Sequence, residues 1–157
     1  MRRIVWTGIV ACLGLTPSLG VSAELPPASP PSVRAVNAPD APSPAGGYAQ
    51  AVEVRTPRRA LYLSGQIPVT ASGETPRNFD AQCRLVWANL EAQLRAAGMS
   101  LDNLVKVTTY LSHRRDAAAN SRIRREALGA RTPALTVIIT GIYDETWLLE
   151  IEAIAAD

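Results

Sequence analysis

The sequence predicts an α+β domain of order ββαβαββ, in which one sheet carries two helices on one face. Short apolar or β-branched runs, which are typical of strands, occur at residues 48–54, 60–64, 104–111, 134–140 and 147–155. Two longer segments, residues 78–98 and 116–128, are expected to be helices, the second closed by Gly129. Because a strand separates the two helices, both are expected to pack on the same side of a single sheet.

Clear local signals bound the first two strands and the helix that follows. Residues 55–59 join the strands as the slightly long turn of a β-hairpin. Asn78 is suited to cap the first helix, and Gly98 is suited to end it. Apolar residues recur every three or four positions along this helix and predict a buried stripe of Phe79, Cys83, Val86, Trp87, Leu90 and Leu94. Cys83 is therefore expected to be a core residue and not a reactive thiol.

The later strands indicate a sheet with two largely apolar faces. In the last strand, the side chains that suit the helix side are Trp147, Leu149, Ile151 and Ala153. Their neighbours point to the opposite face and are Leu148, Glu150, Glu152 and Ile154. Apart from the two glutamates, the strands put few charges on that face. An apolar second face is usually buried by another chain, so the pattern predicts a symmetric oligomer.

The first 46 residues are expected to precede the folded domain. Residues 1–23 combine a positive start, an apolar run and small residues before Glu24, which is typical of a secretory signal peptide. We expect export to a bacterial periplasm with cleavage after Ala23, which leaves no membrane-spanning segment. An uncleaved anchor, or lipidation at Cys12, are the alternatives. Residues 24–46 hold seven of the chain's 12 prolines and predict a tether, so residues 47–157 form the expected domain.

The composition excludes several kinds of site. The chain of 157 residues is 47% hydrophobic and 19% charged, which is ordinary for one globular domain. Arg2 and Arg3 account for its net charge of +2, so the remainder lacks the cationic excess of a nucleic-acid binder. The single histidine, His113, rules out a site that needs two imidazoles and is read as a surface residue. The two cysteines lie on opposite sides of the expected cleavage point, which argues against a disulfide framework or a thiolate zinc site.

Five motifs follow one another in order along the domain. They are Gly47-Tyr48-Ala49-Gln50-Ala51-Val52, Leu63-Ser64-Gly65-Gln66-Ile67-Pro68, Leu90-Glu91 through Ala96-Ala97-Gly98-Met99, Leu104-Val105-Lys106-Val107-Thr108-Thr109-Tyr110 and Leu149-Glu150-Ile151-Glu152-Ala153-Ile154-Ala155. With their spacing, they make residues 37–157 resemble the RidA (YjgF-type) family of reactive intermediate deaminases. The resemblance implies a chorismate-mutase-like α+β fold. It also implies a homotrimer whose sheets line a central barrel, with small-molecule clefts between neighbouring subunits.

The same resemblance implies an activity and a set of cleft residues. Members of the family hydrolyse enamines and imines released by pyridoxal-phosphate enzymes to a 2-keto acid and ammonia, without a metal or cofactor. By position, the cleft residues fall on Tyr48, Ser64, Gly65, Asn120 and Glu150. Glu150 would position the attacking water as the catalytic residue, and the backbone at Ser64 and Gly65 would orient the substrate. Taken alone, these residues also fit structural roles. Tyr48 could be a core aromatic, Ser64 and Gly65 a turn at a strand end, and Glu150 part of an interfacial salt bridge.

The sequence departs from the family pattern at Leu135. The family has an arginine two residues after the proline that begins the fourth strand, and this arginine grips the substrate carboxylate. A carboxylate that faced Leu135 and Val137 instead would lose its water without gaining a partner. Loss of such a contact, worth roughly 2–5 kcal/mol, predicts at least about thirtyfold weaker action on amino-acid-derived imines. Arg131, four residues upstream, is a candidate replacement that would reach in from a loop.

Two classes of function follow from this departure. The first is an enamine or imine deaminase-like hydrolase with altered substrate choice or weak activity. The second is a non-catalytic exported trimer that binds a neutral or apolar small ligand in its clefts. Ribonuclease activity, a label carried by some relatives, is disfavoured by the neutral mature chain and the single histidine.

Arginines gather around the second helix and form the most basic stretch of the domain. They are Arg114, Arg115, Arg122, Arg124, Arg125 and Arg131. A solvated helix face is the usual explanation of such a run. Docking onto an anionic surface is the functional alternative.

Overall fold

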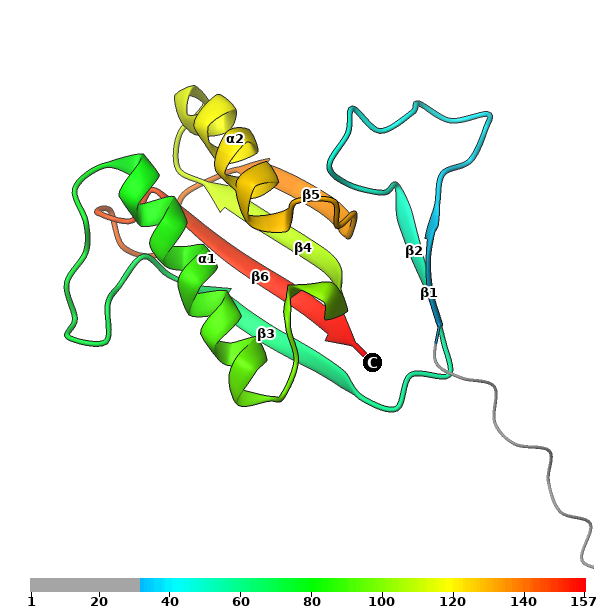
Figure 1. Cartoon of the computed structure of the whole chain (residues 1–157). Helices are drawn as coiled ribbons and strands as arrows, with labels where there is room; N and C mark the ends of the chain where they lie inside the picture. Colours follow the sequence, from blue (N-terminus) through cyan, green and yellow to red (C-terminus); the bar gives the residue numbers. More distant parts are fainter. Residues whose placement is uncertain (1–31) are drawn as a thin grey trace, which may run out of the picture.

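The computed structural model describes residues 32–157, which form a four-stranded sheet with two helices on one face and a separate two-stranded ribbon (Figure 1). In chain order the elements are β1 (Ser32–Val36), β2 (Ala51–Arg55), β3 (Ala60–Gln66), α1 (Phe79–Ala96), β4 (Leu104–Leu111), α2 (Ala117–Leu128), β5 (Ala134–Ile139) and β6 (Leu149–Ala156). The expected signal peptide, its Cys12 and the first part of the expected tether lie outside the described residues.

The four-stranded sheet has the order β3-β6-β4-β5. β6 pairs antiparallel with both β3 and β4, whereas β5 pairs parallel with β4. A parallel neighbour requires a crossover connection, and α2 supplies it. The predicted α+β class, with both helices on one face of the sheet, is confirmed (Figure 1). β5 is left as an edge strand, and its Val137, Ile138 and Ile139 are exposed.

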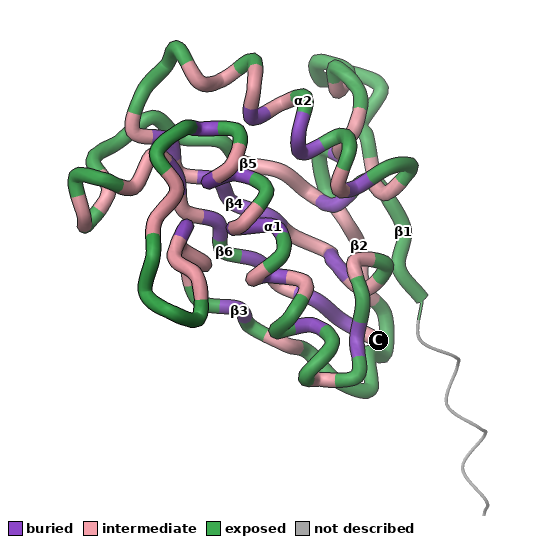
Figure 2. The backbone as a smooth tube through the Cα atoms, turned by 60° about the vertical axis from the view of Figure 1, so that its left-hand side comes forward, coloured by how far each residue is buried: buried purple, intermediate pink, exposed green. Residues whose placement is uncertain are grey.

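Helix α1 begins and ends where the sequence predicts. The side chain of Asn78 caps it by accepting a hydrogen bond from the amide of Ala81 at 2.9 Å. Gly98 follows the helix with a φ of +68°, a conformation that favours glycine. All six residues of the predicted stripe are buried against the sheet. Figure 2 shows buried residues on the inner side of both helices and along the strands beneath them.

The core lies between the helices and one face of the sheet. That face carries Val107, Leu111, Leu149, Ile151 and Ala153, all at most 3% exposed. Side chains alternate across a strand, so the intervening residues of β4 and β6 project to the opposite, open face. The prediction that Glu150, Glu152 and Ile154 face away from the helices is therefore confirmed by the register of β6 on β4.

The expected hairpin of residues 48–54 and 60–64 does not form. β2 pairs with β1, and β3 pairs with β6. The segment between β2 and β3 is held at the end of the chain instead, because the amides of Arg58 and Arg59 both donate to the carbonyl of Asp157. The Arg59 guanidinium also pairs with the Asp157 carboxylate. These contacts hold β3 beside β6 in the sheet, so β2 does not pair with β3 and pairs with another strand.

That partner, β1, lies in the segment expected to be a tether without regular structure. The register sets Val33 opposite Val54 and Ala35 opposite Val52. An ion pair between Arg34 and Glu53, 2.9 Å from Nε to Oε2, supports the pairing. β1 is almost wholly exposed, so the ribbon adds little to the core. Within residues 32–157, no helix is long and apolar enough to cross a membrane.

Candidate functional site

Glu150 and Gly65 meet on the open face of the sheet, where β3 and β6 lie side by side. A Cβ atom built on Gly65 would lie 1.6 Å from Oε1 of Glu150. The carboxylate therefore occupies the space that any other side chain at residue 65 would fill. The pairing of β3 with β6 shifts register between Leu63 and Gln66, so Gly65 lies within this irregularity. Two residues predicted for the site are thus in direct proximity.

The Glu150 carboxylate makes no hydrogen bond or ion pair with another residue of the described chain. It lines a hollow of about 350 Å³ together with Tyr110, Glu152 and the loop of residues 140–143. Glu152 differs, because it accepts a hydrogen bond from the Tyr110 hydroxyl at 3.1 Å. This bond, with the nearby charge of Glu150, raises the pKa of Tyr110 above its usual value. Of the two glutamates, Glu150 is the one available to a small molecule.

Buried polar contacts fix the segment that leads into β6. Gln82 of α1, only 1% exposed, donates to the carbonyls of Pro76 and Thr146 at 2.7 and 2.9 Å. Its side-chain oxygen accepts from the amide of Leu148 at 2.8 Å. Because Leu148 lies two residues before Glu150, these bonds fix the position at which β6 begins and so the position of Glu150 along the sheet. The helical spacing of apolar residues does not indicate Gln82, because this polar residue interrupts the stripe of α1.

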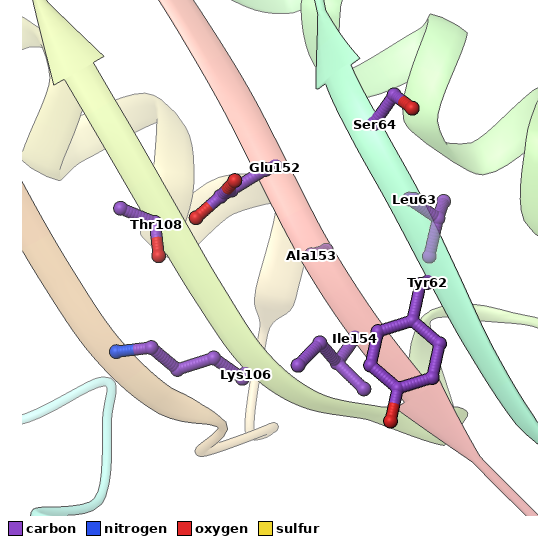
Figure 3. Close-up of a pocket in the computed structure, with 8 residues that line it drawn as sticks. All are labelled: Tyr62, Leu63, Ser64, Lys106, Thr108, Glu152, Ala153 and Ile154. Atoms are coloured by element: carbon purple, nitrogen blue, oxygen red, sulfur yellow. The ribbon is translucent and has the colours of Figure 1, made fainter.

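A second hollow of about 340 Å³ lies further along the same face (Figure 3). Glu152 and Thr108 face one another from β6 and β4, with Tyr62 and Ile154 toward one end (Figure 3). Ser64, another predicted site residue, lies at its rim on β3. Lys106, the only lysine in the sequence, extends toward β5 and donates to the Thr136 hydroxyl. The open face is therefore a mixed polar and apolar surface, and Tyr62 is 76% exposed on it.

The remaining predicted site residues lie elsewhere. In β5, Leu135 pairs with Val107, so Leu135 and Val137 belong to the side of the sheet that faces the helices. Leu135 packs against the core. Asn120 is buried on α2 at 1% exposure. Tyr48 precedes Ala49, which bridges to Ala134 at the start of β5. One chain thus divides the predicted site between two faces of its sheet.

Arg131 and Arg122 are both paired with carboxylates outside the predicted cleft. Arg131 does not turn toward Leu135, because its Nε donates to Asp102 at 2.6 Å and its Nη1 donates to the Leu128 carbonyl. It is therefore occupied away from the predicted cleft. Arg122 pairs with Asp80 of α1 and with Glu126 one turn along α2. Arg84 and then Arg122, which both pair with Glu126, lower the pKa of its carboxyl. Such pairs are typical of a solvated, salt-bridged helix face.

Cys83 is a core residue, as the sequence predicts. The thiol is fully buried, and burial, followed by the charge of Asp80, raises its pKa to about 12. A thiol that keeps its proton is a poor nucleophile. In the part of the chain that the structure describes, no cluster of acidic, histidine and cysteine side chains is arranged to hold a metal ion.

Known proteins resemble this chain across the whole domain. A family model described as Endoribonuclease L-PSP matches residues 38–157. A RutC family protein of Pyrococcus horikoshii is 36% identical over 118 residues, which cover 74% of this chain and 91% of the relative. TdcF of Escherichia coli, which carries the name of a reactive intermediate deaminase, is 31% identical over 119 residues, or 73% of this chain and 90% of TdcF.

Solved structures agree with these sequence matches. A Rid family protein of unknown function, YyfB from Yersinia pestis, superposes with a TM-score of 0.70 at 30% identity, covering 80% of this chain and 98% of YyfB. RidA from an Antarctic Psychrobacter superposes with a TM-score of 0.60 at 29% identity, covering 79% and 99%. Sequence motifs, sheet order and these likenesses lead to one conclusion: the chain belongs to the RidA (YjgF) family, whose family model is described as Endoribonuclease L-PSP.

Proposed function

We propose that this protein is a cofactor-free hydrolase of reactive imines or enamines, and that Glu150 is its catalytic residue. The observation that carries the proposal is the carboxylate of Glu150, which is unpaired within the described chain and held against the bare backbone of Gly65. A relative, TdcF, is named as a reactive intermediate deaminase. A fixed, unpaired carboxylate beside a hollow is suited to hold a water molecule and to take its proton.

The proposed reaction consumes one water for each imine. Glu150 accepts a proton from the water as its oxygen bonds to the imine carbon. The nitrogen takes this proton back from Glu150 to give the carbinolamine. A second proton then passes from the carbinolamine hydroxyl through Glu150 to the nitrogen, so that the carbonyl forms as the carbon–nitrogen bond breaks. The products are a carbonyl compound and ammonia, and the carboxylate regains its original state. No electrons are exchanged, so no redox partner is required.

We propose that the working unit is a homotrimer with its clefts between neighbouring subunits. Two features of the single chain support this assembly. The edge strand β5 exposes Val137, Ile138 and Ile139, which together form an apolar border that another chain would cover. Glu150 and Leu135 also lie on opposite faces of one sheet, so a cleft that contains both needs two chains.

Turnover is tested by following 2-keto acid and ammonia release from freshly generated 2-iminopropionate. We expect activity in the wild-type protein and at least a hundredfold loss in Glu150→Gln, about what removal of a general base costs. Glu152→Gln is the matched control, since it lies on the same strand and face but is hydrogen-bonded to Tyr110. Equal losses in both variants, or no turnover by the wild type, would contradict the proposal.

The second candidate is a non-catalytic trimer that binds a neutral or apolar small molecule in the same clefts. Leu135 favours it, because the side chain at this position cannot pair with a carboxylate. Mass spectrometry of the compounds that copurify with the protein separates the two candidates. An uncharged ligand retained in stoichiometric amount, together with no imine hydrolysis, would favour the binding protein.

We further propose that the protein is exported and cleaved after Ala23. The support is the charge, apolar run and small residues of the first 23 positions. Intact mass and N-terminal sequencing of the protein from its source cell test this directly. A mature chain that begins at Glu24 is expected, whereas a lipid-modified chain that begins at Cys12 or a chain that keeps residues 1–23 would contradict it.

A further inference from the structure

A buried arginine without a partner lies on the helix side of the sheet. Arg124 of α2 is 5% exposed, yet it makes no hydrogen bond or ion pair with any residue from 32 to 157. Its Nε is among the enclosed polar atoms that lack a partner. A buried charge that is not neutralised is strongly unfavourable. Arg122, which α2 presents to α1 and to solvent, is by contrast paired with the carboxylates of Asp80 and Glu126.

The surroundings of Arg124 are also polar and unpartnered. Asn120, one helical turn earlier on the same face of α2, has both its amide nitrogen and its carbonyl oxygen enclosed without a hydrogen bond. On the sheet beneath the helices, the hydroxyl of Thr109 is fully buried and likewise unpartnered. Native proteins rarely leave several such groups unsatisfied in one layer. Of these groups, the Arg124 guanidinium and the Asn120 amide nitrogen lie one turn apart on α2 and are donors suited to an anion.

Tyr48 belongs to the same neighbourhood. Burial and the adjacent Arg125 lower the pKa of Arg124, whereas Tyr48 and Cys83 act in the opposite direction. The chain before Tyr48 also lies on α2, since a Cβ on Gly47 would lie 3.3 Å from Cγ of Arg125. Tyr48 is therefore near α2, beside the start of β5, where Leu135 packs toward the helices.

We propose that Arg124, with Asn120, binds the carboxylate of the substrate and so replaces the cation that Leu135 removes from β5. The proposal rests on the proposed imine hydrolase and concerns which side chains of this protein hold the acid end of its substrate. The planar guanidinium donates two parallel hydrogen bonds to a carboxylate, and the Asn120 amide nitrogen adds a third. An anion there accepts hydrogen bonds from the enclosed donors of Arg124 and Asn120 and neutralises the charge at once.

Binding of pyruvate, a stable 2-keto acid, tests this without turnover. By calorimetry, the wild-type protein is expected to bind pyruvate at least tenfold more tightly than its uncharged amide, pyruvamide. Arg124→Leu is expected to weaken pyruvate binding at least about thirtyfold, and Arg124→Lys by less, because the charge remains but the paired hydrogen bonds are lost. Arg125→Leu, an exposed neighbour on the same helix, should bind as the wild type does.

Further measurements separate the ways in which the proposal can fail. If Arg124→Leu binds pyruvate normally, or if the wild type does not distinguish pyruvate from pyruvamide, the proposal is wrong. If Arg124→Leu dissociates the assembly in sedimentation while pyruvate binding persists in the residual oligomer, the true partner is a neighbouring subunit's carboxylate. Glu150→Gln is expected to bind pyruvate as the wild type does but not to hydrolyse 2-iminopropionate. If the wild type hydrolyses no imine but binds pyruvate, and Arg124→Leu loses that binding, the anion site is supported and the hydrolase function is wrong.

Discussion

The two polar regions of this fold differ in how their charges are accommodated. On the open face of the sheet, Glu150 and Glu152 lie on one strand with access to solvent, so their charges need no protein partner. On the helix side, Arg124 and Asn120 are enclosed, and the described chain supplies no partner for them. Solvent can therefore neutralise the charges of the open face. The enclosed polar atoms of α2, by contrast, are reached neither by solvent nor by a partner from the described residues.

The largest expected effect comes from filling the space over Gly65. Gly65→Val places side-chain atoms where Glu150 Oε1 lies, so the carboxylate must move by more than 1 Å. A displacement of that size costs about a hundredfold in turnover of 2-iminopropionate. Gly141→Ala, also beside the hollow but with open space around its Cβ, should leave the rate unchanged. Normal rates in Gly65→Val would show that the open face does not hold the reacting water.

Gln82→Leu should have the next largest effect, by loosening the segment that leads into Glu150. It leaves the carbonyls of Pro76 and Thr146 and the Leu148 amide without this partner, which lowers the free energy of unfolding by about 2–3 kcal/mol. Urea denaturation followed by circular dichroism measures this. Gln93→Leu, on the exposed side of the same helix, is the control and should change stability little. An equal loss in both variants would contradict the assigned role of Gln82.

A smaller effect of opposite sign is expected at Arg124. Without added anion, Arg124→Leu should raise the free energy of unfolding by about 1 kcal/mol, because replacing an unpaired buried charge by an apolar side chain is often stabilising. Saturating pyruvate should reduce or reverse this difference, since it stabilises only the chain that binds it. Thermal melts of both proteins with and without pyruvate provide the measurement. A destabilised Arg124→Leu without anion would indicate that the wild-type guanidinium already has a partner.

The smallest effect concerns the titration of Tyr110 on the open face. The hydrogen bond to Glu152 raises the pKa of Tyr110, so the folded protein retains this proton to a higher pH than the unfolded chain does. The stabilising contribution is therefore present at neutral pH and is lost as pH rises through the raised value, above about 10. Absorbance titration at alkaline pH should show that Tyr110→Phe lacks one tyrosine with a raised pKa. Glu152→Gln should lower the pKa of Tyr110, and an unchanged titration in that variant would oppose the assignment.

The parts of the fold that could be predicted from sequence are those set by local pattern. The stripe along α1 and its cap at Asn78 follow from helical spacing and from one side chain. β1 was missed because its Val-Arg-Ala-Val run is surrounded by prolines that favour an extended tether. The pairing of β3 with β6 depends on contacts of Arg58 and Arg59 with Asp157, nearly one hundred residues away. No local pattern carries that information.

The candidate site was predictable to a similar extent. Alternation along β6 placed Glu150 on the open face, and the motif around Gly65 suggested its neighbour. The division of Leu135 and Glu150 between two faces required the register of β5 on β4. Arg124 was hidden among the arginines around α2, because only burial distinguishes it from its solvated neighbours. The one signal in the sequence that could have indicated the burial of Arg124 is its spacing, four positions after Asn120 and next to the apolar Ile123.

The single lysine of the chain gives the open face a built-in reporter. Lys106 lies between β6 and β5, with its amine on the Thr136 hydroxyl. Reductive methylation with ¹³C-formaldehyde would label this amine and the chain's N-terminus only. One resonance from the middle of the sheet would therefore reveal, without any substitution, when a second chain or a small molecule covers that surface.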